Sequence, residues 1–305
     1  KSDAKQPEER LAGAQFKFTN LDTNVAVILI TDDDGRAVSS EIPIGAVGED
    51  GSVSLYHFSV QEVKAPEGYL LDQTVHEFQF NVNTDRYQKL TYRYDVADAP
   101  NKVVISKKTL TDKEELPGAY LEVRTVVETV DGDGTAIKKE GELIESWVST
   151  DTPYEIEYLK PGQYVLIETR APEGFLEAER VYFTVKDNMT AEEIPFVEMF
   201  DDDTKVEIKK VDQETKEPLA GVTLRLLRES TGELVKEWVT DETGTIQLMG
   251  LPAGTYLVEE AEPLAGYQLL AEPFRLTVTK DYRLQTFVLD NQKIEVSIEK
   301  RDQET

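Results

Sequence analysis

The sequence contains no cysteine, and this absence removes several classes of protein at once. Disulfide bonds, thiolate metal sites and thiol nucleophiles all require a cysteine side chain. Any covalent lock within the chain must therefore use other chemistry. Histidine is almost as rare, with His57 and His76 as the only two. We interpret both as surface or turn residues, because a zinc site or a histidine-based catalytic centre needs more convergent ligands.

Long apolar runs are also missing. No stretch approaches the roughly 20 residues needed to span a membrane, and no charged and then apolar signal peptide opens the chain. The sequence begins on Lys1 and ends inside a repeat. We therefore interpret it as an excised fragment whose signal peptide and anchor lie elsewhere.

Positive charge is scarce relative to negative charge. The 305 residues include 33 lysines and arginines against 60 aspartates and glutamates, which gives a formal net charge of −27. Such a surface repels phosphate backbones and anionic lipid, which argues against nucleic acid and membranes as partners. We interpret the acidity as a soluble, self-repelling surface and expect a monomer. Because 39% of the residues are hydrophobic, the chain can still build folded cores.

Two acidic segments have aspartates at spacings similar to those of calcium loops. They are TDDDGRAVSSEI and TVDGDGTAIKKE, and each lacks the first ligand, which is Ile30 in one and Thr129 in the other. Neither segment has helical flanks. We therefore predict acidic hairpin turns and no metal site.

The sequence repeats itself three times. The run KVEIKKVDQETKEPLAG overlays KVVISKKTLTDKEELPG without a gap, and a glutamate followed by a Gly-aromatic pair recurs in VQEVKAPEGYLL, LIETRAPEGFLE and VEEAEPLAGYQL. Self-similarity of this kind indicates tandem modules. The repeats predict modules at residues 1–101, 102–204 and 205–293, with residues 294–305 opening a further module.

Within each module the pattern is all-β. Val206, Ile208 and Lys210 alternate with polar positions, and turn signals such as DETG and PAG separate the short runs. Several short strands in a module of about 100 residues predict a two-sheet, immunoglobulin-like sandwich. Trp147 and Trp238 recur in register on expected strands, which favours a core or sheet-face role over sugar stacking.

The first strands of modules two and three place Lys107 and Lys210 on their apolar face. An ammonium at the inward end of such a face is costly to bury unless it is paired or neutralised. The repeats offer two kinds of partner, a glutamate on a mid-module strand and a carboxylate or amide nine positions before the next module's lysine. These partners are Glu62, Glu168 and Glu260, and Asp98, Asp201 and Asn291.

With these residues in place, the chain resembles the collagen-adhesin B-type domains of Gram-positive surface proteins, also called pilin-like or prealbumin-like domains. The resemblance rests on IKKVDQETKEPLAGVTLRLL, YLVEEAEPLAGY and VLDNQK in module three, and on ISKKTLTDKEELPGAYLEV and YVLIETRAPEGF in module two. It covers essentially the whole chain. It implies tandem prealbumin-like sandwiches in which a first-strand lysine and a last-strand Asn or Asp form an isopeptide bond, promoted by the glutamate.

The resemblance assigns a lysine, a promoting glutamate and an acceptor to each module, namely Lys1, Glu62 and Asp98, then Lys107, Glu168 and Asp201, then Lys210, Glu260 and Asn291. In module two, the neighbouring Asp202 and Asp203 stay open as alternative acceptors. Module one departs from the pattern, because one extra residue precedes LAG, the stretch matching MGLPAGTY is shortened to YHF, and the strand before Lys1 is absent.

The resemblance further implies a structural protein with single-turnover self-crosslinking, no cofactor and no external substrate, rather than an enzyme. We expect a stalk or spacer of a cell-wall-anchored, extracellular bacterial adhesin, in which other regions bind any host extracellular-matrix or cell-surface ligand. Two alternatives stay open. One is a ligand-binding adhesive region, for which the longer VVETVDGDGTAIKKEG segment of module two is the candidate. The other is a pilus subunit, which would need a sortase-accepting lysine motif and a sorting signal.

Overall fold

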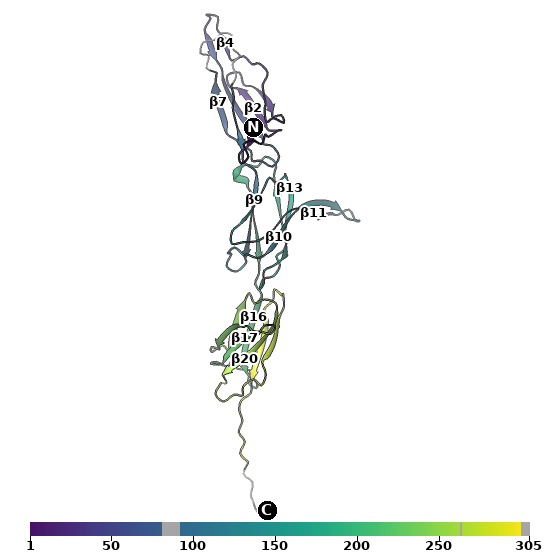
Figure 1. Ribbon diagram of the computed structural model, residues 1–305, viewed down its shortest axis with the longest axis vertical. Coiled ribbons are helices and arrows are strands. Elements are labelled where there is room, and N and C mark those ends of the chain that lie inside the picture. The colour runs from purple at the N-terminus through teal and green to yellow at the C-terminus, as the bar shows by residue number, and fades with distance from the viewer. Residues whose placement is uncertain (81–91, 263, 300–305) are drawn as a thin grey trace, which may run out of the picture.

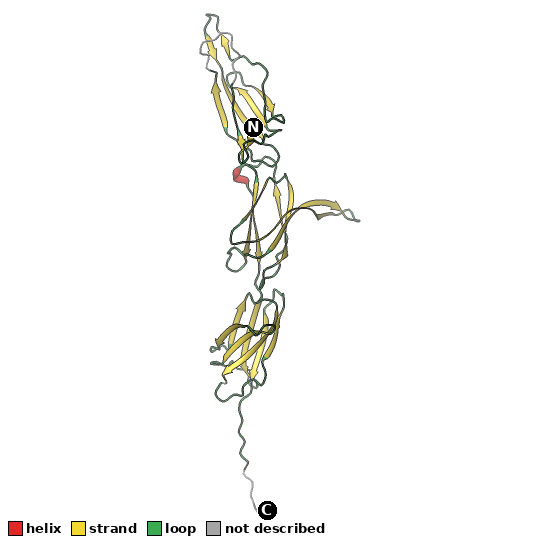
Figure 2. Cartoon of the chain, in the orientation of Figure 1, coloured by secondary structure: helices red, strands yellow, loops and turns green. Residues whose placement is uncertain are grey.

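The structure is a computed structural model that describes residues 1–80, 92–262 and 264–299. Three β-sandwich modules follow one another along the long axis of an elongated molecule (Figure 1). Almost all regular structure is strand, and the only helix in the described ranges is a 3-10 turn, η1 (Ala191–Glu193) (Figure 2). No helix in these ranges is long and apolar enough to cross a membrane. The predicted all-β sandwich fold is therefore confirmed.

The third module consists of a three-stranded and a four-stranded sheet, with the orders β19-β16-β22 and β18-β17-β20-β21. Its strands are β16 (Lys205–Asp212), β17 (Thr223–Arg228), β18 (Leu234–Val239), β19 (Thr245–Met249), β20 (Gly254–Glu262), β21 (Phe274–Val278) and β22 (Gln285–Asn291). The core lies between the sheets, where Val206, Ile208, Leu224 and Leu226 are buried. Because strand side chains alternate between faces, the period-two pattern of the sequence puts these residues on the inner face.

The second module has the same two sheets, ordered β12-β9-β15 and β11-β10-β13-β14. Its strands are β9 (Lys102–Thr109), β10 (Tyr120–Val130), β11 (Ala136–Val148), β12 (Tyr154–Glu157), β13 (Gly162–Arg170), β14 (Val181–Val185) and β15 (Phe196–Asp201). β10 pairs with β13 only as far as Thr125, whereas its pairing with β11 continues to Val130. The remainder of the β10–β11 hairpin therefore projects away from the sandwich (Figure 1).

The first module keeps the four-stranded sheet, ordered β3-β2-β6-β7, and its other strands among the described residues form two separate pairs, β1-β8 and β4-β5. Its strands are β1 (Ser2–Asp3), β2 (Gln15–Asn20), β3 (Val25–Ile30), β4 (Gly45–Val47), β5 (Val53–Leu55), β6 (His57–Lys64), β7 (Val75–Gln79) and β8 (Ala97–Asp98). Residues 294–299, which the repeats assign to a further module, contain no strand, and residues 300–305 lie outside the described residues.

The first and last strands of every module lie side by side and parallel. These pairs are β1 with β8, β9 with β15, and β16 with β22. Their register pairs the expected acceptor with the residue two places after the lysine, as Asp3 with Asp98, Thr109 with Asp201, and Asp212 with Asn291. Residues two apart on a strand share one face, so the lysine and the acceptor become diagonal neighbours on the core side.

Neighbouring modules contact each other directly. At the first junction, the Tyr158 hydroxyl of module two donates a hydrogen bond to Asp3 of module one at 3.0 Å. At the second junction, the Thr204 hydroxyl donates to the carbonyl of Leu251 at 2.6 Å. Each junction is therefore formed by specific polar contacts as well as by the connecting chain.

Candidate functional site

Lys210 of module three lies in the core beside the two residues assigned to it. Its Nζ is 2.5 Å from the amide oxygen of Asn291 and 3.6 Å from the Glu260 carboxylate. The Asn291 amide nitrogen donates to both Glu260 oxygens, at 2.9 and 3.0 Å. The side chains of Lys210 and Glu260 are both 0% exposed. The three groups therefore form a closed polar cluster inside an apolar core.

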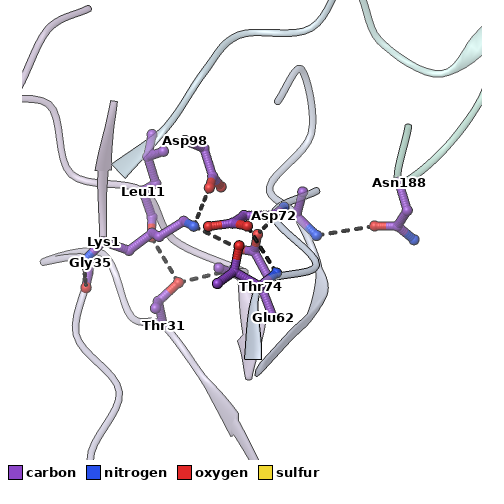
Figure 3. Close-up of polar contacts among 11 residues, drawn as sticks. Lys1, Leu11, Thr31, Gly35, Glu62, Asp72, Thr74, Asp98 and Asn188 are labelled. Carbon is purple, nitrogen blue, oxygen red and sulfur yellow. Dashed lines mark hydrogen bonds and ion pairs between the residues drawn. The ribbon is translucent and has the colours of Figure 1, made fainter. Parts of the chain in front are cut away.

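Modules one and two contain the same cluster with an aspartate in place of the asparagine. Lys1 Nζ contacts Asp98 and lies 2.9 Å from Glu62, as Figure 3 shows. Lys107 Nζ contacts Asp201 and lies 3.2 Å from Glu168. All six side chains are at most 1% exposed. The structure thus brings together each predicted set, including the set of module one, whose sequence departs from the repeat.

Asp201 is the acceptor candidate that reaches the lysine in module two. Its two neighbours make other contacts, since Asp202 pairs with Lys205 at 2.8 Å and Asp203 accepts a hydrogen bond from Thr111, also at 2.8 Å. The alternatives that the sequence left open therefore point away from Lys107.

A β-bulge stands beside the glutamate in every module. β17 pairs Thr223 with Glu262 but Leu224 with Glu260, so that one residue of β20 is skipped, and the same shift occurs between β2 and β6 and between β10 and β13. Bulges re-aim side chains next to functional sites. One oxygen of each glutamate then accepts a backbone N–H ten residues further on, donated by Asp72, Ala178 or Leu270.

In each module, a buried Ser or Thr hydroxyl makes two hydrogen bonds to the backbone of the segment that follows the first strand. Thr240 donates to the Leu219 carbonyl at 2.7 Å and accepts the Val222 N–H at 3.0 Å. Thr31 and Ser149 make the equivalent two bonds in the other modules. This contact was not predicted from the sequence, although the sequence contains a signal for it, a Ser or Thr two places after each recurrent tryptophan.

In modules one and three, a glycine lets a turn pack against the backbone of the buried lysine. A Cβ on Gly244 would lie 2.5 Å from the Lys210 carbonyl oxygen, and one on Gly35 would lie 2.3 Å from the Lys1 carbonyl oxygen. Both glycines have positive φ, at +62° and +68°, which side-chain-bearing residues rarely adopt. The turn therefore needs glycine on both grounds.

Burial changes the proton affinities of the clusters. Removal from water lowers the pKa of the Lys210 ammonium. Burial, together with the charge of the nearby glutamate, raises the pKa of Asp98 and of Asp201 from 3.8 to about 7, against the opposing effect of the adjacent lysine. Both changes favour neutral groups, which is the condition for an amine to attack a carboxyl or an amide.

The two aspartate clusters also contain buried oxygens without a hydrogen-bond donor. These are one oxygen on each of Glu62, Asp98, Glu168 and Asp201. The Glu62 oxygen lies 2.9 Å from Lys1 Nζ, a charge contact without hydrogen-bond geometry. A proton shared between the two carboxyl groups would satisfy one oxygen of each, which agrees with the raised aspartate pKa values.

The other residues singled out in the sequence lie apart from these clusters. His57 and His76 lie on strands β6 and β7 rather than in turns, and His57 is at the surface as predicted, with a side chain that is 62% exposed. Trp147 packs on the module-two core and stacks on Tyr154 at 4.6 Å, which agrees with the predicted core or sheet-face role.

The two acidic segments form turns in which aspartate binds backbone rather than other side chains. Asp131 accepts the N–H groups of Asp133 and Thr135 where β10 meets β11, whereas the turn at Asp32 follows β3 without joining two paired strands. The prediction of a hairpin turn is thus wrong for the first segment. No group of three potential metal ligands occurs within the described ranges.

The chain belongs to the SpaA prealbumin-like fold domain family. The sequence model of that family matches three times, at residues 1–94, 101–197 and 204–293. The resemblance noted in the sequence is thereby confirmed. Domains of this family occur in pilus and adhesin proteins of Gram-positive bacteria, which are structural proteins and not enzymes. No curated protein matches the chain.

Several solved structures are similar to the chain. The Bacillus anthracis TIE protein is 24% identical over 96% of this chain, with a TM-score of 0.43, and the chain spans 50% of that protein. A streptococcal ancillary pilin is 14% identical over 93% of both chains, with a TM-score of 0.33. The minor pilin GBS52 of Streptococcus agalactiae is 19% identical over 66% of this chain and 100% of its own, with a TM-score of 0.29.

Proposed function

We propose that each module closes on itself through an intramolecular isopeptide bond. The bonds join Lys1 to Asp98, Lys107 to Asp201 and Lys210 to Asn291. The observation that carries the proposal is the threefold recurrence of one buried contact, a lysine Nζ against a carboxyl or amide oxygen with a glutamate beside both. An ordinary surface ion pair would have no reason to recur inside three separate cores.

In module three the reaction exchanges one amide for another. The neutral Lys210 amine attacks the Asn291 side-chain carbonyl carbon, and a new C–N bond forms. Glu260 contacts the amide nitrogen that must leave, so it can carry the proton from the lysine nitrogen to that nitrogen. The old C–N bond then breaks and ammonia departs. Folding holds the reacting groups together and thereby replaces a bimolecular encounter.

In modules one and two the same attack releases water. The lysine amine adds to the protonated carboxyl group of Asp98 or Asp201, and the glutamate transfers the amine proton to the departing hydroxyl group. A carboxylate anion would resist attack, so the raised pKa of each aspartate assists this step. The products are one isopeptide bond and one water molecule in each module.

The bonds would make the modules resistant to pulling. Each one links the first strand to the last and closes a loop of 97, 94 or 81 residues. By the loop-entropy relation used for disulfides, such a closure stabilises a module by about 4 to 5 kcal/mol. Force applied to the ends of module three would pass from β16 through the bond into β22. The enclosed residues would then carry no load.

These properties fit a stalk or spacer in a cell-wall-anchored adhesin, and this is the function we propose. Three elongated modules in series set a distance between a cell surface and whatever lies beyond them (Figure 1). Under this proposal the chain is extracellular, acts without a cofactor, and leaves the binding of host matrix or cell-surface ligands to other regions.

Intact-mass measurement tests the bonds. The purified protein should weigh less than its sequence by two waters and one ammonia, and tandem mass spectrometry should recover peptides that join each lysine to its partner. A protein with the unmodified mass would contradict the proposal. Force spectroscopy gives a second readout, because the closed module three cannot release the extension of roughly 280 Å expected from its 81-residue loop.

One observation favours a second candidate function for module two. The projecting part of the β10–β11 hairpin is the kind of surface insertion that a ligand-binding adhesive region would need (Figure 1). Deleting residues 127–139 should leave the predicted bond of module two intact. A loss of adhesion in that variant, with unchanged crosslinking, would assign ligand binding to the hairpin.

A further inference from the structure

The edge strand β3 of module one differs from its counterparts in the other modules. β3, β11 and β18 occupy the same outer position in their four-stranded sheets, each paired with one neighbour among the described residues. The cross-strand pairs align them, since Leu29 faces Phe16 as Trp147 faces Leu121 and Trp238 faces Leu224. Differences between the three strands can therefore be compared position by position.

The central positions of β3 are apolar, whereas the equivalent positions of β11 and β18 are polar. Where module two has Glu145 and Ser146 and module three has Lys236 and Glu237, module one has Val27 and Ile28. In module three, Glu237, which is equivalent to Ile28, forms a cross-strand ion pair with Arg225. In module one the equivalent Lys17 faces Ile28 instead. The sequence VAVILI thus forms an edge strand without a single charge.

The apolar side chains of β3 are exposed to solvent on both faces. Val25 is 63%, Val27 45%, Ile28 51% and Ile30 58% exposed. Charged residues on an edge strand normally prevent pairing with other chains, and an apolar edge of six residues is a template for such pairing. The edge strands β11 and β18 of the other two modules contain such charged residues, whereas β3 contains none. The apolar exposed edge is therefore specific to module one.

The backbone of β3 is also available for pairing. The N–H of Thr31 donates to the carbonyl of Ala14, so Thr31 belongs to the hydrogen-bonded positions of the β2–β3 ladder. Hydrogen-bonded and outward-facing positions alternate along an antiparallel strand. The N–H and C=O groups of Ala26, Ile28 and Ile30 therefore point outward, in the spacing that an added strand requires.

Acidic residues at both ends of β3 indicate the charge of the segment that would pair there. Asp22 precedes the strand, and Asp32, Asp33 and Asp34 follow it, against the nearby cations Lys17 and Arg36. A second copy of the chain is a poor occupant. Antiparallel self-pairing would bring Asp22 of one copy beside the three aspartates of the other, between molecules with a net charge of −27 each.

We propose that β3 is a β-augmentation site for an extended segment of another protein, with an apolar β-branched core and basic residues at both ends. The added strand would hydrogen-bond to the outward groups of Ala26, Ile28 and Ile30. Its flanking cations would meet the aspartates at either end of β3. This surface would give the first module a binding role, independent of the isopeptide bonds.

The test uses a labelled peptide with the core Val-Thr-Val-Thr-Val-Thr between two pairs of lysines. Fluorescence anisotropy should show saturable binding to the whole chain, and hydrogen exchange should slow in β3 when the peptide is bound. Replacing the peptide lysines with glutamate should weaken binding by about tenfold or more, because like charges would then meet at both ends. Absence of saturable binding would overturn the proposal.

Two variants of β3 locate the site. Val27→Lys/Ile28→Glu gives β3 the charges of β18 and should abolish peptide binding. Ile28→Pro should also abolish it, because proline removes an N–H that faces outward and takes no part in the β2–β3 ladder. Circular dichroism checks that each variant is folded, and if one fails to fold the other still tests the site. Unchanged binding in a folded variant would refute the assignment to β3.

A matched control separates a local effect on β3 from a general effect of adding two charged side chains. Leu234→Lys/Val235→Glu puts the same two charges on the edge strand of module three and should leave peptide binding unchanged. An equal loss in this control would overturn the proposal by showing a general charge effect. Sedimentation velocity should find a monomer, and a dimer that Val27→Lys/Ile28→Glu dissociates would reassign β3 to self-association.

Discussion

Modules two and three place a lysine, a glutamate and an acceptor at corresponding positions, but the two clusters differ in charge. Module two holds one lysine between two carboxyl groups, Glu168 and Asp201, whereas module three holds one lysine between the carboxyl group of Glu260 and the amide of Asn291. In their usual ionised forms, these clusters have net charges of −1 and zero. The module-two cluster must therefore gain a proton before a neutral amine can meet two neutral partners, whereas the module-three cluster only has to redistribute its protons.

The hydrogen bonds reflect this difference. In module three the Asn291 amide donates to both Glu260 oxygens. In module two the facing oxygens of Glu168 and Asp201 have no donor. A bound proton would supply the missing donor, and module one has the same deficiency at Glu62 and Asp98. With an amide as acceptor, the cluster supplies its own hydrogen-bond donor. With a carboxyl group as acceptor, the cluster needs a bound proton, so its hydrogen bonding depends on pH.

Removal of the glutamate should have the largest effect. In Glu260→Ala the ammonia loss should disappear from the intact mass while both water losses remain, and Glu168→Ala should remove one water loss. Positioned proton transfer contributes roughly 10²- to 10⁴-fold to such a rate. Glu259→Ala, on the adjacent position of β20, serves as the control and should crosslink fully. Normal ammonia loss in Glu260→Ala would remove that residue from its assigned role.

The pH dependence should separate the two cluster types. Above pH 7, Asp98 and Asp201 are increasingly ionised, so the rate of each water loss should fall about tenfold per pH unit, and ammonia loss should not share this decline. The measurement dilutes urea-unfolded, uncrosslinked chain into buffers of different pH and follows intact mass after quenching. Parallel profiles for all three bonds would contradict the difference in proton requirement.

The same pKa values predict how the folded, uncrosslinked modules respond to pH. Folding raises the pKa of these aspartates, so the folded state binds more protons than the unfolded state between about pH 4 and pH 7. The stability of uncrosslinked modules one and two should therefore fall as pH rises through this window and level off above it.

Exchanging the acceptor residues of modules two and three should exchange the group that each module loses and the pH dependence of that loss. Asn291→Asp should replace the ammonia loss of module three with a water loss and make its rate fall above neutral pH. Asp201→Asn should do the reverse in module two. Peptide mapping after digestion assigns each loss to its module. A pH profile that stays with the module rather than with the acceptor would show that the surrounding core, and not the acceptor's charge, sets the proton requirement.

The smallest expected effect concerns the buried hydroxyls. Thr240→Val keeps the shape of the side chain but leaves the Leu219 carbonyl and the Val222 N–H without their partner. Such a loss costs about 1 to 3 kcal/mol of unfolding free energy, measurable by urea denaturation. The exposed Thr243→Val is the control and should change stability much less. Crosslinking should proceed in both variants, because the hydroxyl of Thr240 does not contact the cluster.

Most residues of the three clusters could be predicted from the sequence, because the same residue types recur in register in each repeat. The period-two alternation of Val206, Ile208 and Lys210 predicts one shared face, and all three side chains are buried there. In-register recurrence then singled out the glutamates and the acceptors without any structure. The choice among Asp201, Asp202 and Asp203 could not be made in this way, because counting positions does not reveal which side chain of an irregular strand end faces the core.

Other features follow from pairing across the fold and leave only weak local signals. The bulge that directs Glu260 depends on the register between β17 and β20, in which Leu224 pairs with Glu260 although the two residues are 36 positions apart (260 − 224) along the chain. The projection of the β10–β11 hairpin depends on where β13 stops pairing with β10. Local sequence patterns predict strands, but the ends of pairing are decided by non-local contacts.

The sequence by itself determined the absence of thiol chemistry, the all-β modules, their number and the three residue types of each cluster, because composition, alternation and repetition are local properties. The tertiary structure decided which aspartate meets Lys107, how the glutamate is aimed, and that the outer edge of β3 has no strand partner among the described residues while its apolar side chains lie in solvent. These outcomes depend on the parallel pairing of the first and last strands and on sheet register, which bring distant residues together only in the folded chain.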